Sequence, residues 1–279
     1  MPELPEVEAM ARTLRPLVRG QRIRCVHALH PIATRPQAPA QFAKRCEGRR
    51  VRSVWRHGKY LFLELDRGLM ELHFKLDGRL IWFSSAKDLL KRANRGTDGV
   101  HVDVALEFAR GALGFVDGRH FGRVHGWESV EDCVPLQRLG VDALSPEFTT
   151  EFLGAKLSGS RTPLKQFLLN QTRVAGIGNI YSCEALWHAK LDPRRHGKSL
   201  RRKEAAKFHK AIVSVLRRAL ECCLYPAPVF RDPNWWFQGL EKILRVYQRE
   251  GLPCKRCGQP IKRLEQGGRS TYFCSRCQR

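Results

Sequence analysis

Hydrophobic positions change their period along the chain. Near the start, Val7, Met10, Leu14 and Val18 follow one another every three or four residues, and the run stops at Gly20. This spacing predicts an amphipathic helix that ends at a glycine. Several of the short apolar runs that follow are separated by turns that contain glycine, which is typical of antiparallel hairpins. We therefore expect strands over 22–29, 49–55, 60–65, 69–74, 80–83, 101–108 and 112–116.

Helical spacing returns after about residue 136. Helices are predicted near 147–157, 163–171, 179–189 and 199–222, and the last is expected to begin at a Ser199 cap. One face of that last helix is apolar and should be buried. It carries Phe208, Ile212, Val215, Leu216 and Ala219.

The C-terminal segment carries two Cys-x-x-Cys pairs. Sixteen residues separate Cys254 and Cys257 from Cys274 and Cys277, a spacing that suits one tetrahedral zinc held by two hairpin knuckles. Two disulfides are the alternative for these four residues. We expect one structural Zn²⁺, because a hairpin this small cannot bury a core of its own. The remaining cysteines show no ligand spacing and are interpreted as packing residues: Cys25, Cys46, Cys133, Cys183, Cys222 and Cys223.

The charge of the chain points to a polyanionic partner. Its 279 residues include 50 Lys and Arg against 27 Asp and Glu, a formal net charge of +23. The basic residues are spread along the sequence, which favours a folded surface that follows phosphates over a basic tail. A membrane surface is the rival partner. The chain shows neither a signal peptide nor a run of roughly 18 apolar residues, so we expect a soluble, cytoplasmic protein without a membrane partner.

The first residues could carry chemistry. Initiator methionine is normally removed before a small residue, and removal of Met1 would leave Pro2 with a secondary amine that titrates near 8. Such an amine can attack a carbon and become an iminium ion, as lysine does in Schiff-base catalysis. Glu3 and Glu6 could simply complement the dipole of the predicted helix.

Three separated motifs resemble the formamidopyrimidine-DNA glycosylase and endonuclease VIII family, in the same order and almost end to end. They are Met-Pro-Glu-Leu-Pro-Glu-Val-Glu at 1–8, Gly-Ile-Gly-Asn-Ile-Tyr at 176–181 and the cysteine module. The resemblance implies an α+β multidomain fold. Its expected parts are an antiparallel β-sandwich with a leading helix over 1–135, a helix–two-turn–helix domain over 136–245, and a β-hairpin zinc finger over 246–279.

The resemblance also implies a function. The protein would be a bacterial base-excision repair glycosylase that removes formamidopyrimidines and 8-oxoguanine, with abasic-site (AP) lyase activity by β,δ-elimination. Its partner would be double-stranded DNA with damaged bases or abasic sites, bound by a monomer associated with the nucleoid. Pro2 would attack C1′ of a flipped nucleotide, and Glu3 would protonate the sugar ring oxygen.

Other site residues are carried over by position. Glu6 and Lys59 complete the catalytic set, and Lys59 matches the lysine that contacts the target phosphates. An apolar wedge, a cation and an aromatic would fill the hole left by the flipped base: Leu76, Arg119 and Phe121. Phosphate contacts are expected from His73, Lys165, Asn179 and Arg269.

The chain also departs from the family pattern. The usual Asp-Pro-Arg-Arg-Phe-Gly is Asp-Gly-Arg-His-Phe-Gly over 117–122, and 222–237 contains Cys-Cys and Trp-Trp-Phe where a Gly-Gly-Thr-Thr-type segment is common. Specificity for oxidised pyrimidines, as in endonuclease VIII, therefore stays open. So does a zinc-finger reader of damaged DNA that has lost catalysis. A generic ribosome- or RNA-binding module would leave the N-terminus unexplained.

Overall fold

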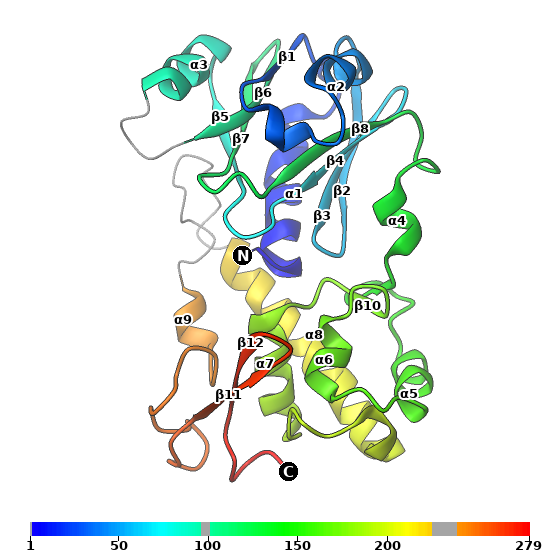
Figure 1. Ribbon diagram of the computed structural model, residues 1–279, viewed down its shortest axis with the longest axis vertical. Helices are drawn as coiled ribbons and strands as arrows, with labels where there is room; N and C mark the ends of the chain where they lie inside the picture. The colour runs from blue at the N-terminus through cyan, green and yellow to red at the C-terminus, as the bar shows by residue number, and fades with distance from the viewer. Residues whose placement is uncertain (1, 96–100, 225–238) are drawn as a thin grey trace. The chain divides into compact units, whose positions relative to one another are not determined.

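The computed structural model describes residues 2–95, 101–224 and 239–279 (Figure 1). The chain divides into two compact units, which are treated separately below. The first comprises 1–137 with 223–238, and the second comprises 138–222 with 239–279. Met1 and the aromatic segment 225–238, which carries the Trp-Trp-Phe departure, lie outside the described residues.

Two four-stranded antiparallel sheets form the framework of the first unit, as the sequence predicted (Figure 1). One sheet has the order β1-β6-β7-β5, with β1 (Cys25–Ala28), β6 (Val102–Phe108), β7 (Gly111–Val116) and β5 (Arg79–Phe83). The other has the order β2-β3-β4-β8, with β2 (Val51–His57), β3 (Tyr60–Leu65), β4 (Leu69–His73) and β8 (Arg123–Trp127).

Helix α1 (Leu4–Val18) lies against strand β2 and buries the predicted apolar face. Val7, Met10, Leu14 and Val18 are all fully buried. Arg15 on this helix donates two hydrogen bonds, of 3.0 and 2.9 Å, to the carbonyl of Val54 in β2. The helix is therefore fixed to the sheet by both apolar packing and a charged donor.

The sequence did not predict several elements of the first unit. Strand β8 was missed because Gly126 interrupts its alternation of polar and apolar residues. A Cβ at Gly126 would lie 3.0 Å from the Cβ of Arg45 and 3.2 Å from the Sγ of Cys46, so this glycine allows helix α2 to approach the strand. The other missed elements are η1 (Pro31–Thr34), α2 (Pro39–Cys46), α3 (Ala86–Arg95) and α4 (Val134–Arg138).

Helices form most of the second unit. They are α5 (Thr150–Ser158), α6 (Leu164–Leu169), α7 (Asn179–Ala189), α8 (Arg202–Leu224) and the short α9 (Leu240–Ile243), with the hairpin β11 (Lys262–Gln266) and β12 (Arg269–Phe273) at the C-terminus. A two-residue parallel pair joins β9 (Val141–Asp142) to β10 (Val174–Ala175). Among the described ranges, no helix combines the length and apolar character needed to cross a bilayer.

The start of α8 differs from the prediction, although its apolar stripe is buried as expected. Ser199 does not cap this helix. It belongs to the 3-10 turn η2 (Gly197–Ser199), where its hydroxyl donates to the carbonyl of His196. The helix begins at Arg202, because Glu204 accepts a hydrogen bond of 2.9 Å from the backbone N–H of Arg201 and so takes the capping role.

A buried carboxylate joins α7 to the chain that enters the cysteine module. Glu184 is 2% exposed, and it accepts hydrogen bonds of 2.8 to 2.9 Å from the backbone N–H groups of Arg245, Val246 and Tyr247. Burial raises the pKa of Glu184, and the three donors work against that rise. A charged acceptor with three aligned donors is among the strongest local constraints a fold can use.

We predict that Glu184→Ala destabilises the protein by at least about 3 kcal/mol, because three buried donors lose their acceptor. Glu184→Gln keeps one acceptor oxygen and should lose less. Urea unfolding of the zinc-loaded protein, followed by circular dichroism, measures both. The control is Glu221→Ala on the exposed side of α8. A loss no larger than that of the control would contradict the assigned role of Glu184.

Candidate active site

The first residues of the described chain are buried and held by a helix cap. Pro2 is buried, Glu3 is 1% exposed, and Glu6 is fully buried. Glu3 and Glu6 form a capping box in which the backbone N–H of Glu3 donates to a carboxylate oxygen of Glu6 at 2.8 Å. A chain end is normally poorly ordered. Here the cap holds the backbone directly after Pro2 in one conformation.

Two ion pairs and a hydrogen bond connect helix α1 to the β2–β3 turn. Arg56 contacts Glu8 at 3.0 Å and donates to the carbonyl of Gly58 at 3.2 Å, and Arg12 also pairs with Glu8 at 2.8 Å. Burial alone would raise the pKa of Glu8, but the two arginines hold it below its ordinary value. Lys59 lies in this turn and is 8% exposed. The helix that begins beside Pro2 and the turn that carries Lys59 are therefore parts of one braced assembly.

His73 is the last residue of strand β4, at the end of the sheet next to the β2–β3 turn. Its register partner is Tyr60, whose ring meets the imidazole edge-on with centroids 4.3 Å apart. Burial, together with the charges of Lys75 and Lys59, lowers the pKa of His73 to about 3. Nδ1 accepts a hydrogen bond of 3.0 Å from the backbone N–H of Lys75. The ring is thus neutral with its proton on Nε2, and an N–H of this kind suits a phosphate oxygen.

The three residues expected to fill the hole left by a flipped base come together on two loops. Leu76 and Phe121 are 39% and 48% exposed, which is unusual for large apolar side chains. Arg119 pairs with Asp77 at 3.5 Å, and its guanidinium lies 5.6 Å from the centroid of the Phe121 ring. The structure thus brings a wedge, a cation and an aromatic to one exposed place.

A buried aspartate builds the loop that carries Arg119 and Phe121. Asp117 is fully buried, and its carboxylate accepts from the backbone N–H groups of Arg119 and Gly122. The loop is therefore folded by an internal acceptor.

In the second unit, the predicted phosphate contacts converge on Ser270. The side-chain amide of Asn179 donates to the carbonyl of Ser270 at 3.1 Å. Arg269, the residue before Ser270, is exposed. Lys165 is fully buried, and its ammonium donates to the carbonyl of Ser270 at 2.8 Å and to the hydroxyl of Thr271 at 2.7 Å. In this arrangement Lys165 holds strand β12 from the interior, whereas Arg269 faces outward.

Gln171 shapes the glycine loop before Asn179. Its side-chain amide donates to the carbonyl of Ile177 at 2.9 Å, and its oxygen accepts from the N–H of Gly176 at 3.0 Å. Gly176 has φ of +105°, a conformation that favours glycine. The loop therefore presents Asn179 from a fixed backbone at the start of α7.

The four predicted zinc ligands fit one ion. The sulfur atoms of Cys254, Cys257, Cys274 and Cys277 all lie within 4.8 Å of one another, and those of Cys257 and Cys274 are 3.5 Å apart. A tetrahedral Zn²⁺ with bonds of about 2.3 Å needs sulfurs about 3.8 Å apart. The indole N–H of Trp187 donates to the sulfur of Cys254 at 3.4 Å, which anchors the site on α7.

Comparison with known proteins decides the family. Models of the formamidopyrimidine-DNA glycosylase N-terminal domain and of the formamidopyrimidine-DNA glycosylase H2TH domain match residues 1–124 and 139–223. A zinc finger found in FPG and IleRS matches 251–279. Formamidopyrimidine-DNA glycosylase of Bacillus licheniformis is 35% identical, with both chains fully covered. That of Moorella thermoacetica is 39% identical over 95% of this chain and 94% of its own.

The chain belongs to the formamidopyrimidine-DNA glycosylase family.

Solved structures agree with this assignment. The LlFpg protein in complex with a THF-DNA and an inhibitor has a TM-score of 0.85 and 29% identity, and both chains are covered completely. Lactococcus lactis Fpg bound to DNA that contains an oxidised pyrimidine has a TM-score of 0.84 and 29% identity over 99% of each chain. The predicted α+β fold, with its glycosylase domains and zinc finger, is thereby confirmed.

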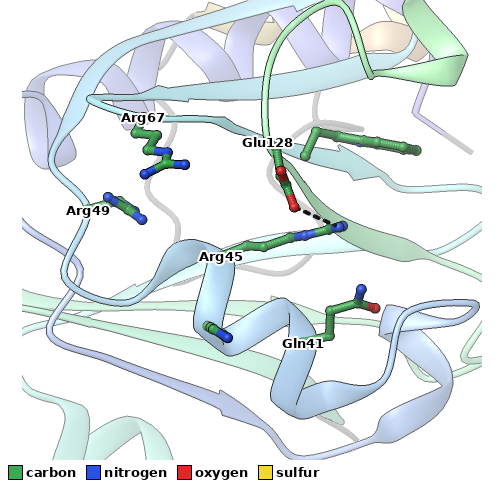
Figure 2. A pocket seen from close by; sticks show the side chains of 7 residues that line it. Gln41, Arg45, Arg49, Arg67 and Glu128 are labelled. Atoms are coloured by element: carbon green, nitrogen blue, oxygen red, sulfur yellow. Dashed lines mark hydrogen bonds and ion pairs between the residues drawn. The ribbon is translucent and has the colours of Figure 1, made fainter.

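A basic hollow of about 370 Å³ also lies on the first unit of this glycosylase. Figure 2 shows Arg45, Arg49 and Arg67 around it, with Arg45 paired to Glu128. Arg67 lies in the β3–β4 turn, whereas Lys59 lies in the β2–β3 turn, and these turns are at opposite ends of the same sheet. The hollow is thus separate from the end of the sheet that carries Lys59 and His73.

The residues that hold the predicted functional residues in place were not identified from the sequence. Arg56, Asp117, Gln171 and Glu184 each hold backbone or side chains that carry predicted functional groups. Only Asp117 gave a local signal, because an aspartate before glycine is typical of a turn. Arg56 and Gln171 bind backbone groups two to six residues away, but no spacing in the sequence marks these contacts. Glu184 binds backbone groups more than 60 residues away.

The neutral state of His73 predicts a pH dependence of stability. Its pKa is about 3 in the folded protein against an ordinary 6.5. Between these values the unfolded chain binds a proton that the folded protein does not, so the free energy of unfolding falls as pH falls below 6.5. At pH 5 the loss is about 2 kcal/mol. His73→Gln should remove that part of the slope between pH 7 and pH 5 in urea unfolding. An unchanged slope would contradict it.

Proposed function

We propose that this protein excises formamidopyrimidines and 8-oxoguanine from duplex DNA and then cleaves the strand at the resulting abasic site, with the amine of Pro2 as nucleophile. Membership of the family supports the glycosylase activity. The single observation that carries the catalytic assignment is the fixed backbone directly after Pro2, built by Glu3 and Glu6 on a helix that Arg56 braces against the Lys59 turn.

The first step needs a free secondary amine, so Met1 must be removed. The nitrogen of Pro2 attacks C1′ of the flipped nucleotide, a new C–N bond forms, and the glycosidic bond breaks with its electron pair leaving on the base. The attached nitrogen loses its N–H proton, which balances the proton that the departing base takes up. Glu3 then donates a proton to the sugar ring oxygen, the C1′–O4′ bond opens, and the nitrogen lone pair completes an iminium ion.

Strand cleavage follows from the same iminium ion. The iminium acidifies the C2′ proton, and its removal by a base expels the 3′ phosphate by β-elimination. Loss of a further proton conjugates the chain and expels the 5′ phosphate by δ-elimination. Water then hydrolyses the iminium, which frees Pro2 and releases the sugar fragment as an unsaturated aldehyde. The products are a gap in the strand with a phosphate at each end.

Other residues hold the DNA. We assign phosphate contacts to Lys59, His73, Asn179 and Arg269, because these side chains offer charged or neutral donors at positions braced from behind. Lys165 acts as a positioning residue for β12 in this assignment. The zinc ion, held by the four cysteines, would stabilise the hairpin that carries Arg269 and takes no part in the chemistry.

The wedge residues hold the flipped state. Leu76 and Phe121 would stack in the hole, and Arg119 would pair with the orphaned base, at the expense of unstacking energy of about a few kcal/mol. We propose a monomer in the bacterial cytoplasm, associated with the nucleoid, with domains over 1–135, 136–245 and 246–279. The names of the similar solved structures, which include complexes with damaged and abasic DNA, support the DNA partner.

Oxidised pyrimidines are a second class of candidate lesion. The similar Lactococcus lactis protein has been solved with DNA that contains an oxidised pyrimidine. The lesion panel in the experiment below therefore contains both classes.

The experiment compares strand cleavage of duplexes that carry 8-oxoguanine, a formamidopyrimidine, dihydrouracil or an abasic site. We expect the untagged protein to cleave, and both Pro2→Gly and a short peptide fused before Pro2 to reduce the rate at least about a thousandfold, since the nucleophile is altered or acylated. The matched control carries the same peptide after Arg279. Full-rate cleavage by the N-terminal fusion would sink the assignment of Pro2.

A second prediction concerns the wedge. Phe121→Ala should lower kcat/KM for 8-oxoguanine excision about tenfold to a hundredfold, because a stacking contact worth about 1–3 kcal/mol is lost. Val130→Ala, which truncates a side chain that is also exposed on the first unit, is the control and should leave the rate unchanged. Equal rates for the two variants would refute the wedge role.

A further inference from the structure

Two histidines and an aspartate form a cluster outside the residues that the reaction uses. His30 follows β1, Asp103 lies on β6, and His120 lies in the loop between β7 and β8. One potential ligand atom from each lies within 4.8 Å of the other two. The rings of His30 and His120 stack with centroids 3.9 Å apart, and Nδ1 of His120 is 2.8 Å from a carboxylate oxygen of Asp103. Three elements distant in sequence thus converge on one point.

Asp103 carries an unusual buried charge. Asp103 is fully buried, and its Oδ2 atom has no hydrogen-bond partner among the described residues. Burial raises the pKa of Asp103, and contact with His120 opposes that rise. A buried carboxylate with one unpaired oxygen is costly unless a cation balances it. Asp103 also occupies a bulge, since the register between β6 and β7 shifts between Val102 and Val104. Bulges re-aim side chains beside functional sites.

We propose that His30, Asp103 and His120 bind a divalent transition-metal ion, with Zn²⁺ as the reference ion. Two imidazoles and one carboxylate are a ligand set that such ions take in proteins, with positions left for water. Ligand atoms around a zinc ion lie about 3.4 Å apart for bonds of about 2.1 Å. His30 is exposed, so its ring can turn from the stack on His120 to bring the three ligand atoms to that spacing.

The site would act on the loop that carries the wedge. His120 lies between Arg119 and Phe121 and has a positive φ of 55°. The backbone N–H of His30 donates to the carbonyl of Asp103 at 3.0 Å, so two of the three ligands already share a rigid base. A metal bound to all three would fix His120 to that base and restrict the movement of its neighbours. The ion would thus tune how freely Arg119 and Phe121 enter DNA, which goes beyond the proposed excision reaction.

Cobalt titration of the full-length protein, with the cysteine site already loaded with zinc, tests the site directly. We expect one further Co²⁺ to bind with a visible d–d spectrum that lacks the near-ultraviolet charge-transfer band of thiolate ligands. His30→Ala should weaken this binding at least about tenfold, since loss of even an outer partner of a metal ligand weakens affinity by that much. His196→Ala, which removes an exposed histidine of the second unit, is the matched control and should bind as the unaltered protein does.

Amide hydrogen exchange of residues 117–122 supplies the second measurement. Zn²⁺ at saturation should slow exchange in this loop in the unaltered protein and in His196→Ala, but not in His30→Ala. Two results would overturn the proposal. One is a titration in which Co²⁺ binds no further site, or binds His30→Ala and the unaltered protein equally. The other is loop exchange that does not respond to the metal.

Discussion

The proposed catalysis by Pro2 requires the N-terminus to be held in place, and the capping box of helix α1 is the interaction that holds the backbone directly after it. A free proline amine can attack C1′ only if it is positioned next to that carbon, and terminal residues are usually poorly ordered. The carboxylate of Glu6 closes the helix over Glu3, and burial of both residues leaves the chain one conformation directly after Pro2. In the proposed mechanism Glu6 therefore has a positioning role, and its neighbour Glu3 is the acid.

The other predicted functional residues are held in place in a similar way, by side chains that bind the backbone around them. Arg56 holds the turn that carries Lys59, Asp117 folds the loop of Arg119 and Phe121, and Gln171 shapes the glycine loop. In each case a buried or partly buried polar side chain satisfies backbone groups of the segment that carries the predicted functional residue. A protein with a net charge of +23 has many more lysine and arginine side chains than its phosphate contacts require. Placement, rather than charge, is therefore what distinguishes the few cations that matter.

Periodicity and motif spacing predicted much of this molecule. The alternating runs of the first unit and the apolar stripe of α8 were sufficient, because both reflect one buried face. The four cysteines were predicted because metal geometry imposes a spacing on the sequence. Strand β8 was not predicted, because Gly126 is needed for the close approach of helix α2 and not for the strand pattern. The start of α8 was predicted wrongly, because Glu204 and not Ser199 caps the helix. The role of Lys165 stays a prediction, and its hydrogen bonds to Ser270 and Thr271 are contacts that the sequence pattern did not indicate.

The most direct test of the account is borohydride trapping of the untagged protein on duplex DNA that contains 8-oxoguanine, followed by proteolysis and mass spectrometry of the adduct. The account predicts a covalent protein–DNA species in which the reduced sugar is attached to the peptide that begins with Pro2. An adduct on a lysine, or stable DNA binding with no adduct on lesion or abasic duplexes, would contradict it.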